Sequence, residues 1–162
     1  MTDTELTLRP VTDADHNVVA EILTREWHDI HVALGTLGRV DASRLPGWIA
    51  ERGTELVGLL TYHVGDDTVD LVTINAFDRG GVGSALLRAL IDSARDVGAT
   101  RVRVTTTNDN TRALWFYQQA GFRLSALRVG AVAEARRLKP QIPETGLDGI
   151  PLRDEVDLEF LL

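Results

Sequence analysis

Apolar residues recur along this chain with two different periods, which together predict a mixture of helices and strands. Apolar side chains spaced every three or four positions predict helices over residues 13–25, 82–98, 110–121 and 131–138. Alternating or β-branched runs predict strands over residues 5–11, 47–51, 55–64, 68–77, 101–107, 122–129 and 156–161. In the first helix, the expected buried stripe consists of Val18, Val19, Ile22 and Leu23. The segment 27–37 fits neither period.

The order of these elements predicts an α/β fold. The hairpin expected over 47–64 turns around Arg52-Gly53 and leads into the run 68–77, which indicates an antiparallel meander. The succession of strand 68–77, helix 82–98 and strand 101–107 indicates a right-handed parallel crossover. We therefore expect a single domain over residues 1–162, with a mixed, twisted sheet of six or seven strands flanked by about four helices.

Composition narrows the classes of function. The 162 residues, 44% of them hydrophobic, suffice for one sizeable core. The net charge of -7 argues against nucleic acid as a partner. The chain lacks an apolar run of about 18 residues, the length that spans a membrane, and its first residues are polar. We therefore expect a cytoplasmic protein that is not embedded in a membrane. Because the chain has no cysteine and its four histidines are widely scattered, we expect no disulfide, no cysteine nucleophile and no metal site.

A glycine-rich turn stands where the strand 68–77 gives way to the helix 82–98. Gly80, Gly81 and Gly83 leave the backbone amides of the helix start open, and those amides with the helix dipole favour an anion such as a pyrophosphate. A tight turn without a ligand is the alternative. The turn lacks the Gly-Lys-Ser/Thr ending of a P-loop, and Leu86 replaces the third glycine of a dinucleotide fingerprint. A different diphosphate carrier is therefore indicated.

The helix 110–121 places two polar side chains on one face. Asn110 and Tyr117 are seven residues apart, or about two helical turns. An ordinary amphipathic helix capped by Asn110 and closed by Gly121 is the alternative interpretation.

The turn at 78–84, the Asn-x-x-Ala-x-x-x-Tyr pattern from Asn110 to Tyr117 and the Gly121-Phe122 exit together resemble the GNAT superfamily of acyl-CoA N-acyltransferases. The resemblance covers most of the chain and implies the fold of that superfamily. The family's Gln/Arg-x-x-Gly-x-Gly/Ala loop falls on 78–83, where Asp78 departs from the pattern. Since an acid cannot donate a hydrogen bond to phosphate, this role passes to the amides of 79–84, with Arg79 as a substitute cation. The tail resembles that of a small, mostly uncharacterised subgroup ending in LKPxIPxxGxxGIPxxDE.

This resemblance implies an N-acetyltransferase that moves the acetyl group of acetyl-CoA to a primary amine by direct attack in a ternary complex. Tyr117 would protonate the departing thiolate, and Asp70 would act as the base, with a histidine or water as alternatives. Strand alternation predicts that Asp70 shares a face with Val72 and Ile74. The resemblance assigns coenzyme binding to Ile74, Asn75, Ala76, Phe77, Arg79, Gly80, Gly81, Val82, Gly83, Ser84, Asn110 and Ala113. The alternatives are that Tyr117 only packs within its helix and that Asp70 is a solvated carboxylate.

In the family, the acceptor pocket is formed by segments that correspond here to 27–37 and about 138–155. The first segment offers Trp27, His28 and His31 as pocket residues, and either histidine is an alternative base. In or next to the second segment, three acids favour a cationic amine, namely Asp154, Glu155 and Asp157. Three basic residues there favour an acidic acceptor instead, namely Arg136, Arg137 and Lys139. The sequence does not identify the acceptor, which is a small molecule or an exposed amino group. A catalytically weak acyl-CoA-binding module is the alternative function. The resemblance to this family also suggests a homodimer.

Overall fold

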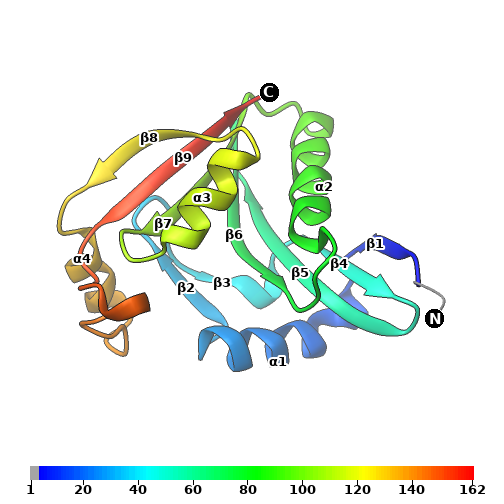
Figure 1. Cartoon of the computed structure of the whole chain (residues 1–162), viewed down its shortest axis with the longest axis horizontal. Helices are drawn as coiled ribbons and strands as arrows, with labels where there is room; N and C mark the ends of the chain where they lie inside the picture. The colour runs from blue at the N-terminus through cyan, green and yellow to red at the C-terminus, as the bar shows by residue number, and fades with distance from the viewer. Residues whose placement is uncertain (1–3) are drawn as a thin grey trace.

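The computed structural model describes residues 4–162, which build a twisted seven-stranded sheet (Figure 1). The strands are Leu6–Pro10 (β1), Gly47–Arg52 (β4), Glu55–Val64 (β5), Thr68–Ala76 (β6), Arg101–Thr107 (β7), Arg123–Arg128 (β8) and Glu155–Leu161 (β9). Their order is β1-β4-β5-β6-β7-β9-β8. Only the β6/β7 pair within this sheet is parallel. The predicted mixed α/β sheet, including its parallel crossover, is confirmed.

Within residues 4–162, four α-helices flank the sheet and create two cores. They are His16–Trp27 (α1), Val82–Asp96 (α2), Thr111–Gln119 (α3) and Ala131–Leu138 (α4). Buried side chains of α1 pack against Leu59 and Val72 on one face, whereas those of α2 and α3 pack against Leu60 and Leu71 on the other. No helix within residues 4–162 has the length and apolar character needed to cross a bilayer.

The first helix differs from its predicted pattern at one position. Val18 is 38% exposed, while Val19, Ile22 and Leu23 are buried as expected. Each residue of a helix turns by about 100°, so the neighbour of a fully buried position can face solvent. Val18 was therefore wrongly included in the buried stripe.

The segment with neither period forms a second, two-stranded sheet from His31–Leu34 (β2) and Gly38–Asp41 (β3). Val32 is buried and joins the core under α1. Strands of four residues are too short to display a clear alternation, which is why the sequence did not predict them. This hairpin lies beside α1 and α4 (Figure 1).

The parallel strands β6 and β7 separate along their length. They pair only from Thr68↔Arg101 to Leu71↔Val104. Beyond that point β6 continues to pair with β5, and β7 continues to pair with β9. The backbone of β6 after Leu71 therefore has no strand partner on its β7 side, which opens a cleft between the two central strands.

A bulge in β6 coincides with this separation. Thr61 pairs with Thr73 but the next residue of β5 pairs with Leu71, which leaves Val72 as an extra residue. A bulge interrupts the alternation of faces. Val72 consequently packs with the α1 core, and Ile74 packs against the core under α2 and α3.

Candidate active site

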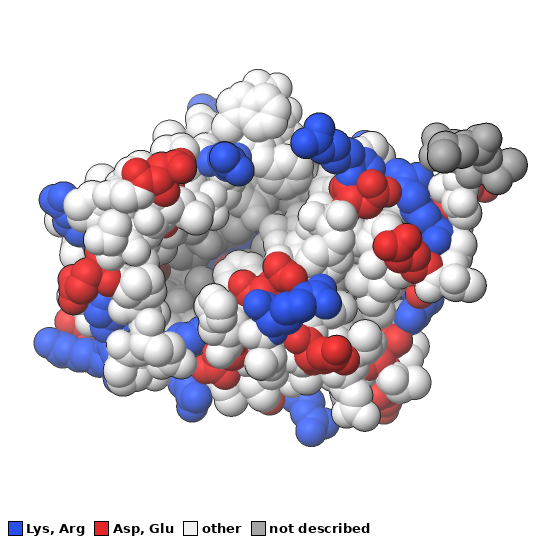
Figure 2. Space-filling model, turned by 60° about the horizontal axis from the view of Figure 1, so that its bottom comes forward, with Lys and Arg blue, Asp and Glu red and all other residues white. Residues whose placement is uncertain are grey.

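A cavity of about 380 Å³ occupies the cleft between β6 and β7. Its wall combines residues of both strands and of α3, namely Leu71, Val72, Ile74, Ala76, Val104, Thr105, Thr106, Asn110, Arg112, Ala113, Phe116 and Tyr117, with Trp27 and Gly83 completing it. Figure 2 shows one face of the molecule hollowed near its middle, and the wall of the hollow is mostly uncharged. Such a mixture of apolar walls with a few polar groups is typical of a ligand site.

The glycine turn opens into the cleft at the start of α2. Gly80 and Gly81 have φ angles of 90° and 82°, a conformation that glycine adopts without strain. The Ala85 amide donates to the Gly81 carbonyl at 2.9 Å, so the amides of 82–84 precede the first bond of the helix. A Cβ on Gly83 would lie 3.4 Å from the Phe116 ring, close to the cleft wall. These amides offer an anion site at the edge of the cavity.

Arg52 braces the glycine turn from the neighbouring strand β4. Its Nε donates to the Asp78 carboxylate at 2.7 Å, and its guanidinium also reaches the carbonyls of Arg79 and Gly80, both at 3.4 Å. Asp78 therefore anchors the turn instead of meeting an anion, which explains its departure from the family pattern. Sequence reasoning missed Arg52, because a partner 26 residues away leaves no local signal.

The predicted residues around the turn differ in exposure. The side chain of Arg79 is exposed and forms no ion pair within residues 4–162. Val82 is buried in the core under α2, and Ser84 is exposed. Phe77 is 39% exposed, with the Arg25 guanidinium 5.3 Å from the centre of its ring. The backbone amides of 82–84 are open to a ligand through the helix start, and the exposed side chain of Arg79 lies beside them in the turn.

Strand β6 contributes three further predicted residues in two different ways. Ile74 and Ala76 line the cavity. Asn75 instead accepts a hydrogen bond from the indole Nε1 of Trp27 at 2.8 Å. Asn75 therefore positions Trp27, which lines the cavity, and does not line the cavity itself.

Tyr117 lies on the cavity wall and is only 4% exposed. Its ring packs between Phe116 and Phe122, with ring centres 5.3 Å and 5.6 Å away. Within residues 4–162 no group forms a hydrogen bond with its hydroxyl, and burial raises the pKa of that hydroxyl. The Tyr117 hydroxyl is therefore neutral, and its ring is held between two aromatic neighbours.

Asn110 caps α3 and also lines the cavity. Its Oδ1 accepts the Ala113 amide at 3.1 Å, so the capping interpretation is confirmed. The cap leaves the side-chain amide group of Asn110 available to donate within the cleft.

Asp70 lies outside the residues that line the cleft. It is 4% exposed, and its carboxylate accepts from Arg103 Nε at 2.6 Å and from a second Arg103 nitrogen at 3.2 Å. Its expected place on one face with Val72 and Ile74 is wrong for Ile74, because the bulge at Val72 turns the later residues to the opposite face. The ion pair occupies both carboxylate oxygens.

A second cavity, of about 180 Å³, adjoins the cleft. It shares the wall residues Trp27, Val72, Thr105, Thr106 and Asn110 with the first cavity. Its other walls come from β2, α4, the segment before β9 and the ends of β7 and β9 that meet there, namely Val32, Ala33, Leu34, Thr107, Val132, Ala135, Ile142, Leu152 and Glu155. Segments 27–37 and 138–155 thus meet at this cavity. His28 and His31 line neither of the two cavities, and the His31 Nδ1 lies 3.2 Å from Asp29.

The segment before β9 is fastened to the end of β7. Asn108 accepts hydrogen bonds from the amides of Arg153 and Asp154, both at 3.0 Å. Asp109 accepts from the Thr107 hydroxyl and, at 2.8 Å, from the Leu147 amide. These bonds hold one wall of the second cavity in place.

Comparisons with known proteins agree with this geometry. The sequence matches the acetyltransferase (GNAT) family over residues 13–122. The uncharacterized proteins YdhI and YxbD of Bacillus subtilis (strain 168) are 30% and 31% identical over 149 residues, which cover 91% of this chain and 92% and 93% of theirs.

Solved structures of the same fold contain coenzyme. A Bacillus subtilis acetyltransferase in complex with CoA is 22% identical, with a TM-score of 0.69 over 98% of this chain and 99% of that one. A GNAT family acetyltransferase from Elizabethkingia anophelis with acetyl-CoA bound is also 22% identical, with a TM-score of 0.68 over 99% and 100%. Together with the family match over more than half of the sequence, these findings show that the chain belongs to the acetyltransferase (GNAT) family.

Proposed function

We propose that this protein transfers the acetyl group of acetyl-CoA to a primary amine, on a small molecule or an exposed amino group, by direct attack in a ternary complex. The observation that carries the proposal is the cleft between β6 and β7. It has open helix amides at one edge and the unpartnered Tyr117 hydroxyl on its wall. The coenzyme in the solved relatives supports the same cosubstrate.

The residues present fit acetyl-CoA. The amides of 82–84 would bind its pyrophosphate, because Gly80 and Gly81 let the backbone turn there without strain. Ile74 and Ala76 would line the path of the pantetheine arm, and the free side-chain amide of Asn110 would donate to it. Acetyl-CoA itself supplies the activated thioester.

The chain supplies two further contributions to the reaction. Tyr117 would donate its proton to the departing sulfur, since burial keeps its phenol neutral. Backbone N–H groups of β6 beyond Leu71 have no strand partner on the β7 side and would stabilise the developing oxyanion. Neither Asp70 nor His28 or His31 lines the cavities, so we propose that water accepts the proton of the amine.

A catalytically weak acyl-CoA-binding module is the second candidate, because the predicted base Asp70 is occupied by Arg103. Release of free coenzyme A, followed with a thiol reagent in the presence of a panel of primary amines, distinguishes the two. The chain has no cysteine, so the protein gives no background signal in this assay. Release of coenzyme A that depends on an amine supports the enzyme. Binding of acetyl-CoA without release of coenzyme A in the presence of any amine would favour the module.

A further inference from the structure

Glu155 is a buried carboxylate at the junction of two cavities. It is 3% exposed and begins β9. It lines the second cavity described above and also a third cavity, of about 410 Å³, which lies between the β2/β3 hairpin and α4. The two cavities also share Ala33, Leu34 and Ala135. Glu155 thus stands where an elongated acceptor would pass from the cleft toward α4.

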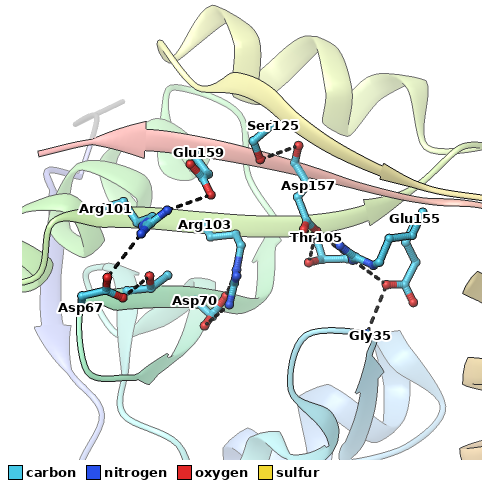
Figure 3. A network of polar contacts seen from close by, with 12 residues as sticks. Gly35, Asp67, Asp70, Arg101, Arg103, Thr105, Ser125, Glu155, Asp157 and Glu159 are labelled. Carbon is cyan, nitrogen blue, oxygen red and sulfur yellow. Dashed lines mark hydrogen bonds and ion pairs between the residues drawn. The ribbon is translucent and has the colours of Figure 1, made fainter.

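Only one oxygen of this carboxylate is occupied. The Gly35 amide donates to Glu155 Oε2 at 3.1 Å (Figure 3). An Arg128 nitrogen donates to the same oxygen at 2.9 Å. Within residues 4–162 no group donates to Oε1. A Cβ on Gly35 would lie 2.8 Å from Oε2, so the hairpin approaches the carboxylate as closely as a glycine permits. The carboxylate is held firmly, and its second oxygen remains open.

The surrounding charges leave an excess of negative charge. Arg128 also contacts both carboxylate oxygens of Asp157, so one guanidinium serves two carboxylates. Thr105 donates to Asp157 as well, at 2.7 Å. Burial raises the pKa of Asp157, but the bonds from Arg128 and Thr105 outweigh that effect and lower it. Arg103 is already paired with Asp70 in a bidentate contact (Figure 3).

Most of the side chains that line the second cavity are apolar, which suits an aliphatic chain. They include Ala33, Leu34, Val132, Ala135 and Leu152, while Asn110 and three threonines from the end of β7 add polar groups. Since Glu155 shares its cationic partner, Arg128, with Asp157, the open oxygen of this buried carboxylate favours a further cation that can donate a hydrogen bond.

We propose that Glu155 binds a second ammonium group of the acceptor, so that the protein acetylates aliphatic diamines in preference to monoamines. This inference rests on the proposed acetyl transfer. One amine of the acceptor lies at the cleft between β6 and β7, its hydrocarbon chain crosses the second cavity, and the distal ammonium donates to Glu155 Oε1. Glu155 is a specificity residue here and takes no part in proton transfer.

The test compares 1,5-diaminopentane with pentylamine and 5-aminopentanol in the thiol-release assay. We expect the diamine to have a kcat/KM at least about ten-fold above both other amines, because a charged hydrogen bond in a buried site exceeds a neutral one by that order. Glu155→Gln should remove this preference by raising the KM for the diamine. Because the substitution also removes the charge that pairs with Arg128, the decisive readout is the ratio of kcat/KM for the diamine to that for pentylamine, which should fall to about one. Glu159→Gln is the matched control, because Glu159 lies on the same strand and pairs with Arg101 outside the cavities.

Several outcomes would overturn the inference. Equal use of the three amines by the unaltered protein, or equal use of the diamine and the amino alcohol, would show that no second ammonium is recognised. An equal loss for all amines in Glu155→Gln would show a structural role. Binding of acetyl-CoA without acetylation of the diamine would overturn this inference alone, whereas failure to bind acetyl-CoA would overturn the proposed function itself.

Discussion

Replacing Tyr117 with phenylalanine isolates the role of one hydroxyl in this cleft. The aromatic ring packs between Phe116 and Phe122, and phenylalanine preserves both contacts. Within residues 4–162 the hydroxyl has no hydrogen-bond partner to lose. We therefore expect Tyr117→Phe to change the free energy of unfolding by less than about 1 kcal/mol.

The effect on turnover should be much larger than the effect on stability. Proton donation to a leaving group contributes about 10²- to 10⁴-fold, and we expect kcat to fall at least about ten-fold, equivalent to about 1.4 kcal/mol of barrier. Burial raises the pKa of Tyr117, so the phenol stays protonated at every pH below about 10. The kcat of the unaltered protein should consequently show no alkaline loss from this group between about pH 7 and 9.5.

The assay combines thiol release for kcat with calorimetry for acetyl-CoA affinity. Tyr62→Phe is the matched control, because Tyr62 is the other tyrosine of the chain, packs against the same core and does not line the cleft. The reasoning predicts a loss of kcat with unchanged affinity in Tyr117→Phe alone. Wild-type turnover in that variant would refute the acid role, and a loss of affinity without a loss of kcat would make Tyr117 a binding residue.

Three further substitutions test the supports of the site and the fold. Arg52→Ala releases the glycine turn and should raise the acetyl-CoA Kd about ten-fold, measured by calorimetry. Gly146→Ala would place a Cβ 2.1 Å from Asp109 Oδ2, and displacing that carboxylate should cost about 2–4 kcal/mol in chemical unfolding. The hydrogen bonds from Arg9 lower the pKa of Asp15 to about 2, so their stabilising effect is present above about pH 4 and lost as the pH falls through 2. Arg9→Gln should therefore be less stable than wild type at pH 6, and the two should converge near pH 2.

Each of these predictions has a control and a contradicting result. Arg95→Ala removes an exposed arginine of α2 and should leave the Kd unchanged, while an unchanged Kd in Arg52→Ala would show that the brace is dispensable. Gly149→Ala meets no atom within 4 Å and should cost only the strain of its positive φ, about 1 kcal/mol. A similar small cost at Gly146 would contradict the close approach to Asp109. A stability difference between Arg9→Gln and wild type that persists below pH 2 would show that the arginine acts by packing.

The sequence predicted the main sheet and helices because their periods are long and regular. The α2 helix, for example, has 15 residues and carries buried side chains from Val82 to Ala94. The β2/β3 hairpin escaped prediction because its strands have four residues each and are half-buried. Its burial depends partly on contacts with α4 and Glu155, which lie far away in the chain.

The sequence predicted the positions of those parts of the candidate site that a local motif marks. The glycine turn and Asn110 could be placed, because a strand end, a helix start and a cap each have a local signal. The face of Ile74 was mispredicted, because the bulge at Val72 arises from the register between β5 and β6 and not from the residues of β6 alone. The brace from Arg52 and the open oxygen of Glu155 likewise depend on pairs distant in sequence.

Calorimetric titration of the purified protein with acetyl-CoA, with coenzyme A and ATP as comparisons, tests the central claim most directly. We expect acetyl-CoA to bind, coenzyme A to bind with similar affinity, and ATP to bind negligibly, because we propose that the cleft binds the pantetheine arm as well as the pyrophosphate. Absence of acetyl-CoA binding, or ATP binding as tightly as acetyl-CoA, would contradict the assignment of this cleft to the coenzyme.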